Sequence, residues 1–182
     1  MSQYKRKKFY STEMLEEAVE QIADIAADDG ILVALIGGFA MQLYGSDRMT
    51  GDIDVIADDA FESLPRGTPL AIGGEQTTAP NGVPVDIVER TDEEARALYD
   101  DALGHAIEIE GIAMRVVLPE YLAVLKIEAG RRKDELDLHF LIADEVIDLE
   151  KTARIIQKHL GRYAVREFWQ TVEIANLERK RQ

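Results

Sequence analysis

The stretch that decides the fold reads Gly37-Gly-Phe-Ala-Met-Gln-Leu-Tyr-Gly-Ser-Asp-Arg-Met-Thr-Gly-Asp-Ile-Asp-Val55. It follows an unbroken apolar run over residues 31–36, which is typical of a buried strand. Gly37 and Gly38 predict a tight turn after that strand, and residues 39–44 predict a short helix closed by Gly45. Backbone amides at Gly38 and at the start of such a helix form a natural cradle for phosphate.

Two carboxylates stand two residues apart at the start of the next strand, which we expect over residues 53–57. Side chains two apart on a strand point to the same face, so Asp52 and Asp54 would share a face while Ile53 points into the core. Such a pair suits a hard divalent cation such as magnesium. The alternative is a solvated strand end, which Asp-x-Asp often marks.

A third carboxylate, Asp86, lies inside another apolar strand, predicted over residues 83–89. An acidic side chain in such a strand needs a partner. If the two strands are neighbours, Asp86 completes a cluster of three carboxylates, an arrangement that can hold two metal ions for in-line phosphoryl transfer. The alternative is an ion pair between Asp86 and Arg90 or Arg115.

The rest of the chain divides into a part with strands and a part with helices only. Periodicity predicts helices over 13–27 and 93–103, a hairpin of strands 106–110 and 113–118, and helices over 119–129, 132–143, 149–159 and 164–177. We therefore predict an α/β (α+β) fold, a mixed β-sheet flanked by helices with a helical C-terminal portion. A core over residues 1–118 would carry a helical lobe over residues 119–182, packed on it as one unit.

The amino-acid composition limits the kinds of functional site that the chain can form. The 182 residues include no cysteine and three histidines, which excludes a disulfide framework, a thiolate zinc site and a cysteine nucleophile. The net charge is −14, yet residues 1–8 and 151–182 are basic. Basic ends attract a polyanion that the acidic middle repels, although solvated tails and helix faces are the simpler explanation. No secretory signal or membrane-spanning stretch is recognisable, so we expect a cytoplasmic protein.

Together, these residues resemble the nucleotidyltransferase superfamily related to DNA polymerase beta. More narrowly, they are similar to the minimal and AbiEii-like nucleotidyltransferases, some of which are toxins of toxin–antitoxin pairs. The matching residues are Gly37, Gly38, Ala40, Tyr44, Gly45, Arg48, Thr50, Asp52, Ile53 and Asp54. The resemblance covers about residues 30–145, including a segment from Tyr121 to Lys126 and another from Ala129 to Leu138.

The resemblance departs from the superfamily pattern in two places. Many members of the superfamily have serine at the position of Gly38. The AbiEii-like proteins, like this chain, have glycine there. The chain is also shorter than many toxin relatives, which argues against a tRNA-type acceptor.

The resemblance implies an enzyme, dependent on Mg²⁺ or Mn²⁺, that moves an NMP group from an NTP such as ATP to a hydroxyl group. Asp52, Asp54 and Asp86 would bind metal, with Asp86 also the general base. Lys126 would act in catalysis by neutralising phosphate charge. The implied nucleotide-binding residues are Gly37, Gly38, Arg48, Thr50, Lys126 and Asp134.

Other roles for these residues stay open from the sequence. Lys126 is equally compatible with a surface lysine that pairs with Glu120 or Glu128. Arg48 either touches a phosphate or braces the acidic strand. Asp134 is typical of a carboxylate in the first turn of a helix. Asp137 either pairs with Arg132 or Lys133 or holds Lys126 in place.

The acceptor and the partners have several alternatives too. RNA (including tRNA), protein and a small molecule all supply hydroxyl groups, and a toxin would have a cognate antitoxin. The rival functions are a catalytically inactive binding or regulatory protein of the same fold and an antibiotic-modifying adenylyltransferase.

Overall fold

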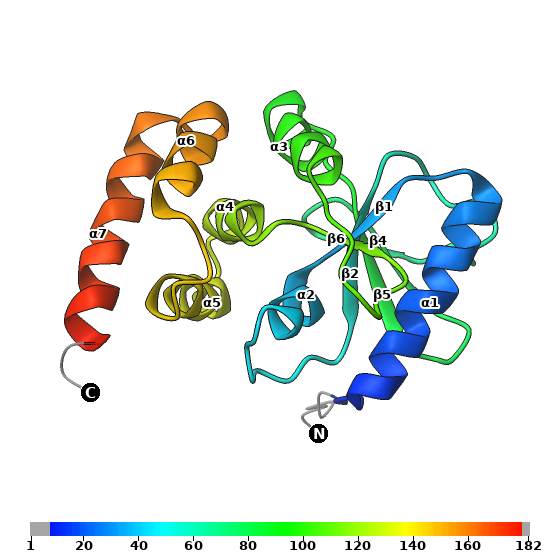
Figure 1. The fold of residues 1–182 in the computed structure, drawn as a ribbon. Coiled ribbons are helices and arrows are strands. Elements are labelled where there is room, and N and C mark those ends of the chain that lie inside the picture. Colours follow the sequence, from blue (N-terminus) through cyan, green and yellow to red (C-terminus); the bar gives the residue numbers. More distant parts are fainter. Residues whose placement is uncertain (1–7, 180–182) are drawn as a thin grey trace, which may run out of the picture. The chain divides into compact units, whose positions relative to one another are not determined.

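The computed structural model describes residues 8–179, and the chain divides there into two units (Figure 1). The sheet unit comprises the residues up to Arg90 together with Ala106–Val116, and the helical unit comprises Thr91–His105 and the residues from Val117 on. Most of the predicted basic N-terminus, residues 1–7, and residues 180–182 lie outside the described part. Within residues 8–179, no helix is both long enough and apolar enough to cross a lipid bilayer.

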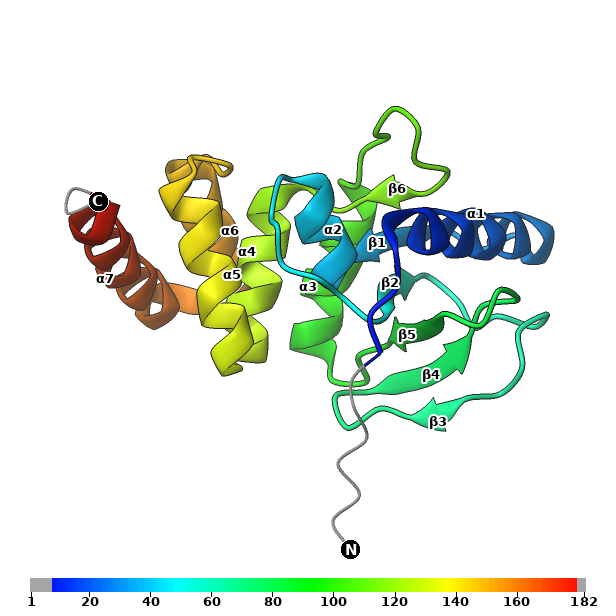
Figure 2. The ribbon, with the colours of Figure 1, turned by 90° about the horizontal axis from the view of Figure 1, so that it is seen from below.

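A six-stranded mixed sheet forms the centre of the sheet unit, with the strand order β3-β4-β5-β2-β1-β6. The strands are β1 (Val33–Ile36), β2 (Ile53–Ala57), β3 (Thr68–Pro69), β4 (Gly74–Thr78), β5 (Pro84–Val88) and β6 (Arg115–Val116). β2 runs antiparallel to β1 and parallel to β5, while β4 runs antiparallel to β5 and β3 (Figure 2). The predicted mixed sheet is thereby confirmed.

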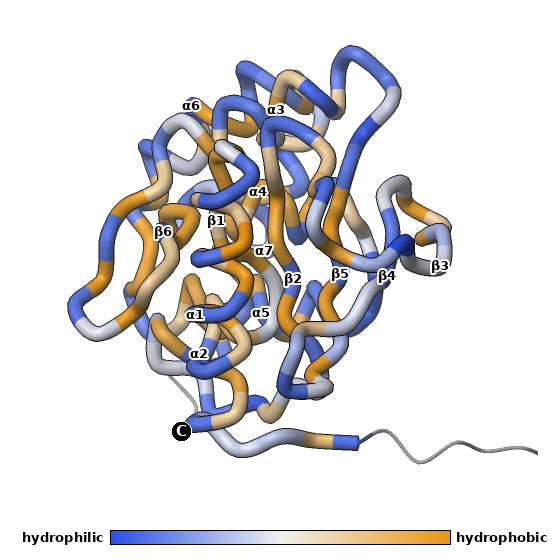
Figure 3. Tube along the Cα trace, turned by 90° about the vertical axis from the view of Figure 1, so that its right-hand side faces the viewer, coloured by the Kyte–Doolittle hydropathy of each residue, from blue (hydrophilic) through white to orange (hydrophobic). Residues whose placement is uncertain are grey.

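Two helices, α1 (Thr12–Asp29) and α2 (Gly37–Leu43), pack on the central strands β1 and β2. Ser11 caps α1 by accepting a hydrogen bond from the Met14 amide, and Gly30 ends it in the left-handed conformation. Apolar residues of α1 meet those of the strands, and Figure 3 shows the hydrophobic colouring of β1 and β2. In β2, Ile53 and Val55 are fully buried on either side of half-buried Asp54, as strand alternation requires.

The structure departs from the sequence-based expectation at the edges of the sheet. β3 and β4 were not predicted, because their residues are polar and show no apolar alternation; they form by backbone pairing along the edge of β5. The predicted hairpin over 106–118 is reduced to one antiparallel bridge, Ile107 with Val116. Its second strand, β6, pairs instead in parallel with β1, where Val116 becomes fully buried.

The helical unit contains five helices in its described part: α3 (Glu93–Gly104), α4 (Pro119–Ala129), α5 (Arg132–Ala143), α6 (Leu149–His159) and α7 (Gly161–Arg179). α4 is buried along most of its length and contacts α3, α5 and α6. Its bounds and those of α5 and α6 are the predicted ones. Helix α3 belongs with this unit, although it precedes residue 118, where the boundary was placed.

Asp101 ties three of these helices together. Its Oδ2 atom lies 2.7 Å from Lys158 Nζ and 2.7 Å from His159 Nε2 on α6, and it accepts a hydrogen bond of 2.9 Å from the Tyr121 hydroxyl on α4. Burial acts to raise the pKa of Asp101, but these hydrogen bonds outweigh burial and lower the pKa to about 2. Burial and Asp101 together raise the pKa of Tyr121. His105 also faces this group, stacked on the Tyr121 ring.

We predict that Asp101 makes the helical unit sensitive to acid. Because its pKa is lower in the folded than in the unfolded chain, its stabilisation is complete above about pH 4 and is lost as the pH falls towards 2. The free energy of unfolding should therefore fall by about 1–2 kcal/mol more in the wild type than in Asp101→Asn over that interval. Urea unfolding followed by fluorescence of Trp169, the only tryptophan and part of α7, measures it. Equal pH dependence in both proteins would contradict this account.

Candidate active site

The glycine pair predicted as a separate turn is itself the first part of α2, which begins at Gly37. Gly37 has φ +70°, a conformation that favours glycine. A Cβ there would stand 1.9 Å from Asp54 Oδ2, and one on Gly38 would stand 2.6 Å from the Thr50 hydroxyl oxygen. The missing side chains therefore allow Asp54 and Thr50 to approach the backbone closely.

Two of the predicted carboxylates lie side by side on neighbouring strands. Asp54 on β2 and Asp86 on β5 are partners in the parallel register, so both side chains point to the same face of the sheet. Asp54 Oδ2 accepts a hydrogen bond of 3.3 Å from the Gly38 amide, which places this carboxylate at the start of α2. Asp52, just before β2, accepts a hydrogen bond of 2.8 Å from the Thr50 hydroxyl.

Sequence reasoning missed one residue of this row, Gln76. It is the partner of Asp86 in the β4–β5 register, and its Nε2 donates a 2.6 Å hydrogen bond to Asp86 Oδ1. Asp54, Asp86 and Gln76 thus form a polar row across β2, β5 and β4. The only sequence signal was a glutamine between Glu75 and Thr77, in a stretch without the apolar alternation that would have marked a strand.

The predicted phosphate contacts Arg48 and Thr50 lie beside this row. Thr50 is buried at 2% exposure, with its hydroxyl directed at Asp52. The Arg48 guanidinium passes Gly38, with Nη2 3.4 Å from the position that a Gly38 Cβ would take. The side-chain amide of Gln42 donates a 2.8 Å hydrogen bond to the Arg48 carbonyl, which fixes the loop between α2 and β2.

Asp52, Asp54 and Asp86 suit magnesium as ligands, since all of their possible donor atoms are carboxylate oxygens. No three acidic or histidine side chains among residues 8–179 gather closely enough to hold an ion as they stand. Gly38, Thr50 and Gln76 each donate to one of the three carboxylates, so a bound ion would have to compete with these hydrogen bonds. Metal binding by Asp52, Asp54 and Asp86 stays a prediction.

Comparison with known proteins identifies the family to which this chain belongs. Residues 13–180 match the family described as "Nucleotidyltransferase of unknown function (DUF6036)". The chain belongs to this nucleotidyltransferase family. The resemblance to nucleotidyltransferases seen in the sequence is therefore confirmed. No curated protein is similar enough in sequence to match.

Two solved structures share the fold of this nucleotidyltransferase family member. An antigenic nucleotidyltransferase-like protein from Paracoccidioides brasiliensis is 21% identical with a TM-score of 0.52, over 87% of this chain and 95% of that chain. A protein from H. pylori, named as a candidate nucleotidyltransferase, is 16% identical with a TM-score of 0.50, over 93% of each chain. At such identities the likeness establishes the fold alone.

The remaining predicted residues, Lys126 and Asp134, belong to the helical unit. Lys126 is only 7% exposed, and its Nζ lies 2.7 Å from Asp137 Oδ2 and 3.1 Å from Asp134 Oδ1. Arg131 adds a contact of 2.6 Å to Asp134. Burial acts to raise the pKa of Asp134, but Arg131 and Lys126 outweigh burial and lower the pKa.

Two of the alternatives left open by the sequence are decided by these contacts. Lys126 is not a surface lysine paired with Glu120, because Lys126 is buried and Glu120 pairs with Lys151 at 3.2 Å. Asp137, one of whose predicted roles was to hold Lys126, does so. The ion pairs join α4 to α5. Whether Lys126 also meets a phosphate stays a prediction.

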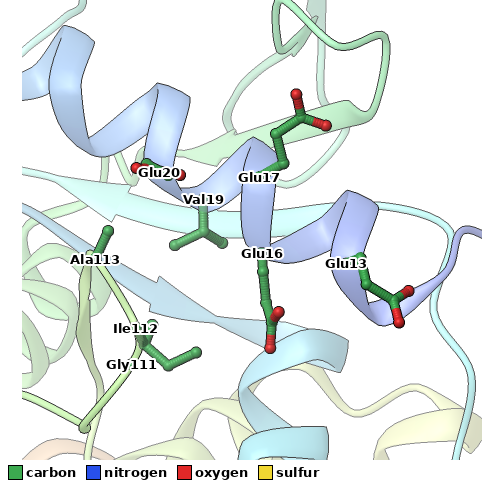
Figure 4. Close-up of a pocket in the computed structure, with 8 residues that line it drawn as sticks. All are labelled: Glu13, Glu16, Glu17, Val19, Glu20, Gly111, Ile112 and Ala113. Atoms are coloured by element: carbon green, nitrogen blue, oxygen red, sulfur yellow. The ribbon is translucent and has the colours of Figure 1, made fainter.

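A separate pocket of about 580 Å³ opens between α1 and the loop before β6 (Figure 4). Its lining consists of Glu13, Glu16, Glu17, Val19, Glu20, Gly111, Ile112 and Ala113. None of the residues predicted to bind nucleotide or metal lines it. Its four glutamates would repel the phosphates of a nucleotide.

We predict that Lys126→Ala destabilises the helical unit by about 3–5 kcal/mol, because two buried carboxylates would lose their shared cation. The control is Lys133→Ala, an exposed lysine on the same helix pair, which should leave stability unchanged. Urea unfolding followed by Trp169 fluorescence compares the three proteins. A Lys126→Ala protein as stable as the wild type would contradict this prediction, because it would show that the ion pairs of Lys126 do not stabilise the helical unit.

Proposed function

We propose that this protein is a metal-dependent nucleotidyltransferase that transfers a nucleoside monophosphate from a nucleoside triphosphate to a hydroxyl group. The hydroxyl oxygen attacks the α-phosphorus, the bond from that phosphorus to the bridging oxygen breaks, and pyrophosphate leaves. One observation carries the proposal: Asp54 and Asp86 stand abreast on one face of the sheet, and Asp54 contacts the start of α2. Paired carboxylates beside a glycine-rich backbone suit a metal–triphosphate complex.

The three carboxylates and the residues beside them then take separate roles. Asp52 and Asp54 would hold the ion that accompanies the triphosphate, and Asp86 would help to hold a second ion and accept the proton of the attacking hydroxyl. When bound, the ions neutralise charge that develops on the phosphates. Gln76 orients Asp86 by occupying one of its oxygens. Gly37, Gly38, Arg48 and Thr50 would meet the nucleotide, and the missing side chains of the two glycines let Asp54 and Thr50 stand against the start of α2.

An inactive binding protein of the same fold is the main rival. Asp54 and Asp86 are register partners of like charge, and their mutual repulsion costs free energy that a bound cation would offset. That cost favours a working metal site over a retired one. RNA, a protein and a small molecule all stay candidates for the acceptor in this proposal. A toxin role with a cognate antitoxin is a narrower version of it.

Incubation with each radiolabelled triphosphate, Mg²⁺ and a cell extract tests the proposal directly. We expect one fraction (nucleic acid, protein or small molecules) to acquire label, and the label to disappear when Asp54 is changed. No labelling of any fraction with any of the four triphosphates, in Mg²⁺ or Mn²⁺, would favour the inactive rival.

We predict that Asp54→Asn separates catalysis from folding. The change preserves shape and an oxygen that can accept from Gly38, and it removes one negative charge beside Asp86, so the melting temperature should stay the same or rise. Transfer should fall roughly 100-fold or more, because the metal loses an anionic ligand worth several kcal/mol. Asp24→Asn, an exposed carboxylate on α1, is the matched control and should change neither. A destabilised Asp54→Asn protein with undiminished labelling would falsify the assignment.

The nucleotide should also depend on the ion for binding. Without Mg²⁺, Asp52, Asp54 and Asp86 repel the negative charge of a triphosphate, so affinity should be weak. Titration calorimetry in Mg²⁺ and in EDTA measures the difference, and we expect at least a tenfold loss of affinity in EDTA. Equally tight binding in both buffers would mean that the nucleotide does not sit at the carboxylates.

A further inference from the structure

In one segment of the helical unit all Lys, Arg, Asp and Glu positions are Lys or Arg, although the whole chain has a net charge of −14. Residues 151–166, which cover most of α6 and the start of α7, contain five Lys or Arg residues and no Asp or Glu. The five are Lys151, Arg154, Lys158, Arg162 and Arg166. A concentration of one sign of charge against the sign of the molecule is a property of surfaces that bind a ligand of opposite charge.

The structure separates these five cations into two groups. Lys151 is paired with Glu120 at 3.2 Å, and Lys158 with Asp101 at 2.7 Å, so both serve the packing of the helical unit. Arg154, Arg162 and Arg166 form no ion pair with any carboxylate of residues 8–179, and all three are exposed. Within residues 8–179, the charge of these three arginines is therefore not engaged in an ion pair.

Two of these arginines share a face of α7 with an exposed aromatic ring. Arg162, Tyr163 and Arg166 fall within about 100° of one another around the helix axis. Tyr163 is 70% exposed, and the Arg162 guanidinium carbon lies 5.2 Å from the centroid of its ring. The opposite side of α7 carries the buried residues Phe168, Val172 and Ala175. Packing therefore needs that opposite side and makes no use of the exposed one, which we call the α7 basic face (Arg162, Tyr163 and Arg166).

We propose that the α7 basic face binds a nucleic-acid strand with unpaired bases. Arg162 and Arg166 would contact successive backbone phosphates, and an unstacked base would lie on the Tyr163 ring. Arg154, on the neighbouring helix α6, adds to the positive potential. The proposal concerns binding alone, so it does not depend on nucleotidyl transfer by the sheet unit.

The chemistry of the face favours this partner over a lipid surface. A membrane-binding helix presents a continuous apolar face to the lipid. In α6, Ile155 and Ile156 are buried inside the unit. On α7 the exposed apolar residues Ile174 and Leu177 lie about two to three turns beyond the α7 basic face and are separated from it by exposed polar and charged residues, so no continuous apolar face adjoins it. An aromatic ring between arginines offers stacking as well as charge, and stacking discriminates a strand with free bases from any other polyanion.

Fluorescence anisotropy of the full chain with labelled oligonucleotides tests the proposal. The probes are single-stranded RNA, single-stranded DNA of the same sequence, and the corresponding DNA duplex. Arg162→Gln with Arg166→Gln should weaken binding of the single strands about tenfold or more, and should lower the slope of log K against log salt by about 1.4, because two phosphate contacts are lost. Tyr163→Ala should weaken single-strand binding about tenfold with the slope unchanged, and should leave the duplex unaffected.

Two variants serve as controls. Arg96→Gln removes another exposed arginine of the same unit, near Asp100 at 3.7 Å, and should bind like the wild type. Arg162→Lys with Arg166→Lys retains the charge and should keep the salt slope. Thermal melts confirm that each variant is folded, which the exposure of these residues leads us to expect.

Several results would overturn the proposal. One is no binding of any single strand up to about 100 µM in low salt. Another is an equal loss of affinity in Arg96→Gln, which would indicate attraction by overall charge. Retention of affinity in Tyr163→Ala would remove the stacking contact and with it the preference for unpaired bases. Binding of phosphatidylserine vesicles that needs Arg162 and Arg166, without oligonucleotide binding, would identify a membrane surface instead.

Discussion

The pairing of β2 with β5 is the constraint on which the candidate site depends. In this register Ile53 and Val55 of β2 lie opposite Val85 and Ile87 of β5, so the apolar residues of both strands reach the core together. Because side chains alternate along a strand, the same register leaves Asp54 and Asp86 abreast on the other face. A slip of one residue would bury a carboxylate and expose an isoleucine. The hydrophobic core and the polar row are therefore specified by one set of contacts.

The second constraint is the close approach of the backbone at the start of α2 to side chains from the loop before β2 and from β2 itself. The start of α2 lies against Asp54 and Thr50 at distances that leave no space for a Cβ on Gly37 or Gly38. The short helix, the loop that follows it and β2 are thus held as one piece. In the helical unit, charged side chains hold the helices together. Lys126 with its two carboxylates joins α4 to α5, and Asp101 joins α3 to α4 and α6.

Sequence patterns predicted the elements and residues that are determined by the local order of amino acids. They missed those that depend on contacts between distant parts of the chain. Asp52, Asp54 and Asp86 were recognisable because each interrupts or precedes an apolar strand, and α4 because Pro119 and Gly130 mark its ends. Gln76 was not, because its strand forms by backbone pairing with β5 and its own residues carry no alternation. The family relationship came from the combination of glycines and carboxylates, which the match over residues 13–180 confirms.

The assignment of α3 to the helical unit has a consequence for how the chain folds. The polypeptide passes from the sheet unit to the helical unit after Arg90, returns for Ala106–Val116 and leaves again at Val117. Neither unit is therefore a continuous piece of chain, and a cut at any single position removes an element from one of them. On the ribosome, α3 emerges long before α6 supplies Lys158 and His159 to Asp101. The helical unit can close only after α6 has been synthesised, whereas every strand found in residues 8–179 is complete by residue 116.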